Sequence, residues 1–261
     1  VINYNDVSGS YDTIYGVSFR NSDNARITGN IISAMGHNYI YALYVCGNEF
    51  GIYDNEITAE SDINYACAIN VEGPGYGLIE YNNIHAKAPS SAYAVYSNNN
   101  EVTVSYVSNT ITAEGFFIFG IYDDSEEIID NTITLTGNYT VGIVVLSEAV
   151  VENNKISLIA SNVGSESIWD LVPMETSGIV VYANASILNN EISSNNKAIS
   201  LLGGSSTITG NVLTGYVYVE SNTNTFTRNM INATSDYAID LGNSTGNVIT
   251  ENELYANELK G

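Results

Sequence analysis

The sequence predicts an all-β fold, a single-stranded parallel β-helix of about ten coils with three short strands in each coil. Three observations lead to this prediction. A six-residue motif recurs along the whole chain, a second strand motif lies between its copies, and the spacing of the copies suits one turn of a solenoid. We expect one domain over residues 1–261, with an irregular excursion at 158–177.

The first motif is an aromatic or aliphatic residue, two variable residues, Asn, one variable residue and an aliphatic residue. Most copies lie 18 to 27 residues apart, with one gap of 36. The aliphatic side chains should point inward. The Asn should occupy a tight corner, because Asn tolerates a left-handed backbone better than other non-glycine residues. Stacked Asn side chains can also hydrogen-bond from coil to coil. The eleven copies contain Asn5, Asn30, Asn55, Asn82, Asn109, Asn131, Asn154, Asn190, Asn211, Asn229 and Asn252.

The second motif is a small residue followed by an aliphatic, a variable and an aliphatic residue. Copies begin at Gly16, Ala42, Ala68, Ala94, Gly142, Gly178, Ala198 and Ala238. Both motifs alternate with period two, which is typical of strands. Coils stacked at about 4.8 Å would make a rod roughly 48 Å long. A leucine-rich or helical solenoid is the alternative, but the sequence has no stretch of helical period.

The excursion at 158–177 fills the longest gap between motif copies and holds the only Trp, Trp169. Long loops in compact repeats are often functional. Two interpretations remain open: an exposed apolar contact site, or a loop that folds back over one face of a sheet.

The motif copies, with their Asn-x-Ile-Thr/Ser coils, resemble the right-handed parallel β-helix repeat of the pectin-lyase-like superfamily. The wealth of Tyr and Asn and the acidity are most similar to β-helical cell-surface proteins of methanogenic archaea, which include adhesin-like proteins and sheath or surface-layer components. The resemblance covers Val1 to Leu254. It implies a right-handed coil and an extracellular place on the cell surface or envelope. It leaves the activity open, because the same coil carries lyases, hydrolases, adhesins and structural proteins.

The charge balance excludes several classes of partner. Lys and Arg number 7 against 29 Asp and Glu, a formal charge of −22. Scattered cations cannot bind nucleic acid or an anionic membrane surface. No apolar run approaches the ~18 residues of a membrane span. Motif copies begin and end the chain without capping segments, so we expect either an excerpt of a longer rod or self-association, end to end or side by side.

The best candidates for catalysis are Asp123 and Asp124. Hydrolysis of a glycosidic bond needs two carboxyl groups about 5 to 9.5 Å apart. The aligned residues of neighbouring coils are Ser97 and Val145, so no second carboxylate supports the pair, and we expect a solvated turn. No two cations occupy equivalent positions of neighbouring coils beside carboxylates, as a lyase of the resembled superfamily would require. We therefore expect no catalysis, with a polysaccharide lyase or glycoside hydrolase as the alternative.

Bound cofactors are not expected. Asp123, Asp124, Glu126 and Glu127 form the densest acidic loop, but it lacks the spaced oxygen ligands of a Ca²⁺ loop, so at most Ca²⁺ would bind loosely. His37 and His85 look isolated. Cys46 and Cys67 should be about 16 Å apart along the strands, too far for a disulfide. Cys67 should pack as a small apolar residue. Cys46 is the better candidate for an intermolecular link, with a free thiol as the default.

Outward-facing aromatic residues mark one side of the expected rod. Tyr44, Tyr96 and Tyr122 should lie along one outer face, with Asn70 between them. This row could stabilise the sheet, contact another subunit or bind sugars. Trp169 is a further candidate for such a contact. Sequons at Asn138, Asn184, Asn232 and Asn243 are consistent with export and N-glycosylation.

Together these features predict a non-catalytic extracellular structural protein of the cell surface, a sheath, surface-layer or adhesin-type rod that assembles through its strand ends and outer faces. The expected partners are other copies of the chain and cell-surface glycans. A polysaccharide-active or carbohydrate-binding β-helix module is the alternative.

Overall fold

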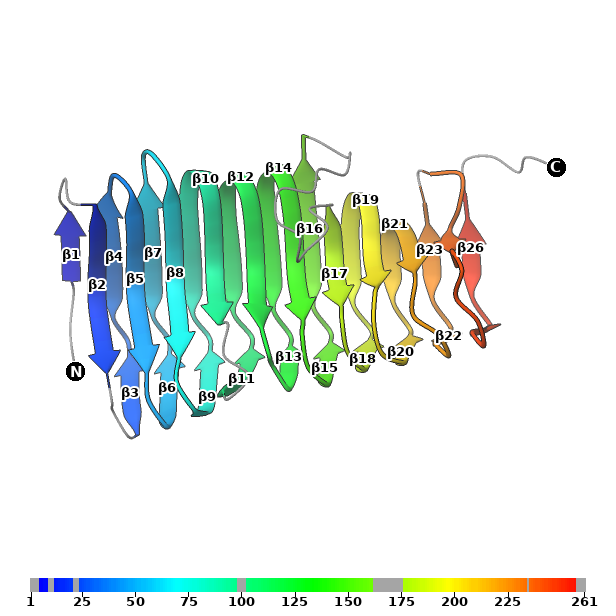
Figure 1. Ribbon diagram of the computed structural model, residues 1–261, viewed down its shortest axis with the longest axis horizontal. Coiled ribbons are helices and arrows are strands. Elements are labelled where there is room, and N and C mark those ends of the chain that lie inside the picture. Colours follow the sequence, from blue (N-terminus) through cyan, green and yellow to red (C-terminus); the bar gives the residue numbers. More distant parts are fainter. Residues whose placement is uncertain are drawn as a thin grey trace.

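The computed structural model describes residues 5–8, 12–20, 24–97, 102–161, 176–233 and 235–256. These residues form an all-β solenoid in which every strand pair is parallel, and the chain progresses steadily from one end of the rod to the other (Figure 1). Among the described residues, no helix is long and apolar enough to cross a membrane.

Two sheets run along the rod. The short sheet has ten strands: β3 (Ala25–Thr28), β6 (Glu49–Tyr53), β9 (Gly75–Glu80), β11 (Val102–Val107), β13 (Glu127–Ile129), β15 (Ala149–Glu152), β18 (Ala185–Leu188), β20 (Ser206–Thr209), β22 (Thr225–Thr227) and β25 (Val248–Thr250). This number of passes agrees closely with the predicted number of coils.

The long sheet bends once across its strands, so that each coil crosses it in two segments. The first segment contains β1 (Asn5–Ser8), β4 (Ile31–Gly36), β7 (Glu56–Ser61), β16 (Lys155–Ala160), β23 (Met230–Asn232) and β26 (Glu253–Tyr255). The second contains β2 (Thr13–Arg20), β5 (Tyr39–Cys46), β8 (Tyr65–Glu72), β17 (Ser177–Val181) and β24 (Ile239–Asp240). Five strands pass through the bend without a break: β10 (Asn83–Ser97), β12 (Thr110–Asp123), β14 (Thr132–Val145), β19 (Glu191–Leu201) and β21 (Val212–Val219). In those five coils, two of the three predicted strands form one continuous strand.

The core consists of columns of aliphatic side chains that pack on their equivalents in the coils above and below. The aliphatic residue of the first motif is buried in each such coil from Ile32 through Ile84 to Ile231. The register pairs these residues directly, as in Ile57 with Ile84. The second motif supplies another buried column, in which Leu43 pairs with Ile69. The predicted inward direction of both motifs is confirmed.

The motif Asn residues form a continuous ladder at the corner between the two sheets. From Asn30 to Asn252, each Asn Nδ2 donates to the Oδ1 of its equivalent in the next coil at 2.8–3.1 Å. The same Oδ1 also accepts the backbone N–H of the preceding Asn, as Asn154 does from Asn131. The predicted coil-to-coil bonding is thus confirmed.

The predicted left-handed Asn is wrong. The positive φ belongs to the residue before the Asn, for example 55° at Asp54, 57° at Tyr81 and 58° at Asp130. The Asn is held in place instead by the hydrogen bonds of its side chain. Its Nδ2 donates to carbonyls of its own coil and of the coil before, as Asn131 does to Ile129 and Tyr106. Before two of the ladder residues, the residue with positive φ is a glycine, Gly29 or Gly210.

The backbone of the first motif copy is out of register with the later copies. Asn5 pairs with Ile32, and Val7 pairs with Ala34, so β1 lies two residues out of the register that the motif predicts. Within the described part of the chain, the buried Asn30 Oδ1 has no hydrogen-bond partner.

The predicted excursion begins later than expected. Residues 158–160 belong to β16, where Leu158 pairs with Leu135 and is buried. Ser177 already lies in β17. Trp169 lies outside the described residues.

Replacing one ladder residue should destabilise the rod. Asn131→Ala removes both roles of one carboxamide and leaves the buried Asn109 backbone N–H without an acceptor. We expect the free energy of unfolding to fall by about 3 kcal/mol, measured by urea denaturation. The control is Asn83→Ala, at an exposed side chain of β10, which should change it by less than about 0.5 kcal/mol. Equal effects of the two changes would contradict a special role for the ladder.

Candidate functional site: a groove along the bend of the long sheet

A row of small residues shapes the bend of the long sheet. Gly36, Ser61, Ala88, Gly115 and Gly137 occupy equivalent positions in five consecutive coils. The coils approach each other closely here. A Cβ added to Gly115 would lie 2.1 Å from the Ala88 carbonyl oxygen, and one added to Gly137 would lie 2.1 Å from the Gly115 carbonyl oxygen. Small side chains thus permit the close approach and leave a hollow outside.

This hollow is a groove of about 640 Å³ that extends over the same five coils. One side carries the outward residues next to the small row, here called the rim row. Its members pair in register on β4, β7, β10, β12 and β14: Met35, Glu60, Lys87, Glu114 and Thr136. Pro89 also lines the groove. Since residues in register stack along the rod axis, the groove runs parallel to that axis.

Charged side chains alternate along the rim row. The Lys87 Nζ lies 3.1 Å from Glu114 Oε2, and both side chains are about half exposed. The hydrogen bond and the charge of Glu114 raise the pKa of Lys87. Glu60 pairs with Lys87 from the other side in the register. Lys87 therefore lies between two carboxylates, which the sequence reading did not find.

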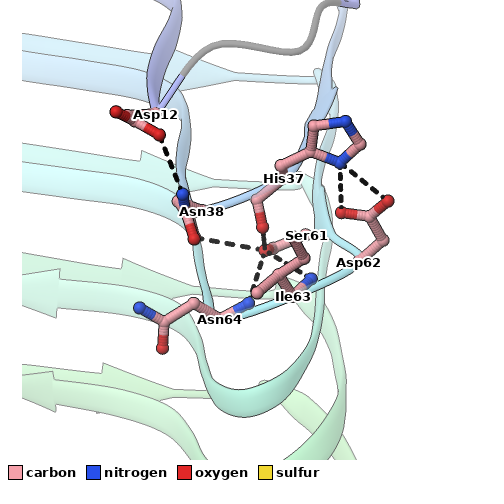
Figure 2. Close-up of polar contacts among 7 residues, drawn as sticks. All are labelled: Asp12, His37, Asn38, Ser61, Asp62, Ile63 and Asn64. Carbon is pink, nitrogen blue, oxygen red and sulfur yellow. Dashed lines mark hydrogen bonds and ion pairs between the residues drawn. The ribbon is translucent and has the colours of Figure 1, made fainter.

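Figure 2 shows two stacked turns, at residues 37–38 and 62–64, whose residues His37 and Asp62 also line the groove. The buried Ser61 hydroxyl donates to the His37 carbonyl at 2.7 Å and accepts the Asn64 N–H at 3.0 Å. His37 Nδ1 lies 2.7 and 2.9 Å from the two carboxylate oxygens of Asp62. His37, expected to be isolated, is thus paired. Its partner is 25 residues away in sequence but adjacent in the next coil.

A row of hydroxyl groups lies two residues before the rim row, on the same face of the sheet. Ser33, Thr58, Thr112 and Thr134 stand in register, with His85 between Thr58 and Thr112. His85 Nδ1 is 2.9 Å from Thr112 Oγ1. The groove and this row together offer apolar surface, carboxylate acceptors and a hydroxyl group in most of the five coils. That combination suits a ligand that itself repeats, with apolar faces and hydroxyl groups.

A second outer feature is a row of stacked aromatic rings on the second segment of the long sheet. Ring centroids are 5.0 Å apart for Tyr15–Tyr41 and 4.7 Å for Tyr93–Phe119. Between these pairs, the register places Cys67 in the row. The Tyr65 ring lies 5.6 Å from Tyr41 and 5.5 Å from Tyr93, so it continues the contacts past Cys67. Sequence reading missed this row.

The predicted outer row of Tyr44, Tyr96 and Tyr122 lies beside it, as expected. Tyr96 and Tyr122 stack at 5.4 Å, whereas Tyr44 is separated from them by the buried Asn70 and donates to Glu72 at 2.5 Å. Rings that stack on one another cover their flat faces, which are the parts a sugar would contact. The geometry therefore favours a ladder that stabilises the sheet, and sugar or subunit contacts of this row stay predictions.

Asp123 lies inside the solenoid. It is 0% exposed, and the Tyr106 hydroxyl donates to its Oδ2. The expected solvated turn is wrong for Asp123 because strand alternation continues to the end of β12: Ile121 points in, Tyr122 out and Asp123 in. Burial raises the pKa of Asp123 to about 6, partly offset by the hydrogen bond from Tyr106. The alignment with Ser97 and Val145 holds, since Tyr96 pairs with Tyr122 and Asp123 with Val145.

Asp124 is partly buried, and burial raises its pKa. Glu126 and Glu127 are exposed. Within the described residues, no group of three or more His, Cys, Asp or Glu side chains is placed to hold a metal ion. Loose binding of Ca²⁺ by this loop stays a prediction.

The remaining sequence candidates are widely separated. Cys46 is partly exposed, Cys67 is buried, and both are free. Burial raises the pKa of the Cys67 thiol to about 12, in keeping with a packing role. Among the sequon residues, Asn184, Asn232 and Asn243 are exposed, whereas Asn138 is half-buried in β14. A residue not singled out, Lys197, is buried with its Nζ 4.1 Å from the centre of the Tyr218 ring, and burial lowers its pKa to about 8.

The internal carboxyl group should make the rod more stable in acid. Because the pKa of Asp123 in the folded chain lies above the ordinary 3.8, its stabilising protonated form is fully present below pH 3.8 and is lost as the pH rises through 6. Between pH 3 and pH 8, the wild type should lose about 3 kcal/mol relative to Asp123→Asn. Urea denaturation across this range measures the difference, and parallel curves for the two proteins would contradict it.

The aromatic row should also contribute to stability. Tyr93→Ala removes the stack with Phe119 and the contact with Tyr65, and should lower the free energy of unfolding by about 3 kcal/mol. Tyr76→Ala, at a Tyr that is 69% exposed on β9, is the matched control and should have little effect. A similar loss in both variants, followed by thermal and urea unfolding, would show that ring stacking does not hold the coils.

Comparison with protein families agrees with this architecture. Residues 60–213 match the model described as the right handed beta helix region, and these residues make up more than half of the chain. The comparisons with curated proteins and with solved structures find no match. The matched residues include four of the five coils that line the groove. With its parallel coils, buried aliphatic columns and matching family model, the chain belongs to the right-handed β-helix family.

Proposed function

We propose that the chain is the rod of a non-catalytic, extracellular cell-surface protein, of adhesin, sheath or surface-layer type, and that it binds a polysaccharide in the groove at the bend. The observation that carries this proposal is the groove itself, about 640 Å³ in volume and built from equivalent positions of five consecutive coils. Its volume lies within the range of about 300–1,000 Å³ that is usual for ligand sites.

The form of the groove favours a linear polymer. Each coil adds one rim residue and, two residues earlier, one member of the neighbouring row, most of which carry hydroxyl groups. A sugar chain along the rod axis would therefore meet a hydroxyl group of the neighbouring row at most steps, beside a rim residue that changes from coil to coil. Sugar hydroxyls pair with Thr, Ser and carboxylate oxygens, while the apolar faces of the rings can pack on Met35 and Pro89.

The stiffness of the rod supports the same proposal. The Asn ladder and the stacked rings fix each coil to the next, so the rim residues keep their spacing before a ligand arrives. A preorganised site loses less conformational entropy on binding.

Catalysis is the alternative. Asp123, the sequence candidate, faces the interior and cannot reach a polymer outside the rod. The groove carboxylates Glu60 and Glu114 are two strand spacings apart, roughly 9.6 Å, near the upper end of the separation found in inverting glycosidases. Glu114 already pairs with Lys87, which favours binding over proton transfer. If the wild type hydrolyses a polysaccharide and Glu60→Gln loses that activity, the catalytic alternative is supported instead.

Export, glycosylation and self-assembly belong to the same proposal. The exposed Asn184 and Asn243 could carry N-linked glycans. The specific likeness to surface proteins of methanogenic archaea remains a prediction, as does assembly with other copies of the chain. Electron microscopy across concentration, with and without divalent cations, would distinguish filaments or sheets from single rods.

Removing the apolar groups of the groove should weaken binding. The double variant Met35→Ala with Pro89→Ala should reduce affinity for a bound polysaccharide about tenfold, or 1.4 kcal/mol, in affinity electrophoresis against a panel of glycans. Ile31→Ala changes an exposed aliphatic residue on the same strand, β4, but outside the groove, and is the matched control.

A second comparison separates the groove from the aromatic row. Tyr96→Ala with Tyr122→Ala should leave the affinity unchanged in protein that remains folded. If this variant loses binding while the Met35 and Pro89 variant keeps it, the site lies on the aromatic row and the groove proposal is wrong.

A further inference from the structure

We propose that the polymer in the groove is cationic, a chain of amino sugars whose free amines are protonated. This inference rests on the proposed function, and it names the ligand class of that same site. It is argued from the charges that line the groove and from the positions of the other cations.

The rod has little free positive charge to offer an acidic polymer. The formal charge is −22. The described cations other than Arg26, which lies on β3 of the short sheet, are engaged by carboxylates or aromatic rings. Lys87 pairs with Glu114, Lys155 with Glu191 and Arg228 with Glu251, while Arg20 lies over Tyr15 and Tyr44, and Lys197 over Tyr218. A uronate or sulfated polymer would bring its charges against like charges.

The groove carries an excess of carboxylates. Glu60, Asp62 and Glu114 line it, against Lys87 and His37. The carboxylates are accessible, since the side chains of Asp62 and Glu114 are 63% and 51% exposed. Each of these two carboxylates already has one partner, His37 for Asp62 and Lys87 for Glu114, and an amine of a bound polymer would join that pair at a position still in contact with water, at a small cost in desolvation.

Lys87 shows how the groove receives an ammonium group. Its Nζ lies 3.1 Å from Glu114 Oε2, and Glu60 stands on its other side in the register. The Lys87 ammonium occupies the position between two carboxylates that a ligand amine would take. Removal of Lys87 should thus free both carboxylates for a cationic ligand, whereas it would remove the one groove lysine that an anionic ligand could use. The two ligand classes predict opposite effects of the same substitution.

The test is isothermal titration calorimetry of the folded 261-residue chain with four polymers of matched length. These are chitosan oligosaccharides with free amines, the same oligosaccharides fully N-acetylated, a neutral glucan and a polygalacturonate. We expect chitosan to bind at least tenfold more tightly than its N-acetylated form at a pH where the amines are protonated. The preference should shrink as salt is added, because the charges are exposed.

Variants then test the residues. Glu60→Gln with Glu114→Gln should lower the affinity for chitosan about tenfold and weaken its salt dependence, while Lys87→Met should raise that affinity. Glu191→Gln, which breaks the Lys155 pair elsewhere on the long sheet, is the control and should change neither. Circular dichroism checks the fold of each variant.

Each outcome separates the two proposals. If the N-acetylated or neutral polymer binds as tightly as chitosan, and the Glu variants have no effect, the groove binds glycans but the inference of a cationic ligand is wrong. Preferred binding of polygalacturonate, or a weaker chitosan affinity in Lys87→Met, would likewise overturn it. If none of the four polymers binds, the proposed function fails together with the inference.

Discussion

The ladder of Asn side chains at the corner between the sheets is the interaction on which the remaining architecture depends. The carboxamides from Asn55 to Asn229 bond to the coil before and the coil after, and several of them also close their own turn, as Asn131 does through Ile129. The ladder fixes one position of every coil, so residues counted from it fall into columns. The buried aliphatic columns, the aromatic rows and the rim of the groove all follow from that common origin.

The fold could be predicted because two chemical demands leave a direct mark on the sequence. An inward position must be aliphatic, and a ladder position must be Asn, so Ile84 and Asn82 show the register without any structure. The conformation of the corner leaves no such mark, since the left-handed residue is the one before the Asn and can be Asp, Tyr, Ser, Asn, Arg, Glu or Gly. Its side chain makes no uniform demand, so it leaves no pattern. The buried Asp123 could have been found by extending the alternation of β12 by one step.

The groove is not evident from the sequence, for a different reason. Its other side lies past the small row, at His37, Asp62 and Pro89, where the number of residues per coil varies. Gly36 and Tyr39 enclose two residues, but Ser61 and Tyr65 enclose three. Motif counting from the Asn ladder does reach Glu60, Lys87 and Glu114, five residues after Asn55, Asn82 and Asn109. The row of small residues that follows at Ser61, Ala88 and Gly115 was therefore an available signal for a hollow. Glu60 and Glu114 lie far apart in the sequence, so a pattern of adjacent carboxylates such as Asp123 and Asp124 does not reveal them.

The direction of the bonds between coils has a mechanical consequence. The bonds of both sheets, the Asn ladder and the stacked rings all connect one coil to the next, so they lie along the rod axis. Tension applied along that axis is shared at every junction by many contacts that must yield together. Tension applied to one edge of a coil would load the contacts between coils one after another, so the coils would separate stepwise. A rod of this construction therefore resists tension along its axis better than tension at one edge. Its resistance to force depends on where the load is attached.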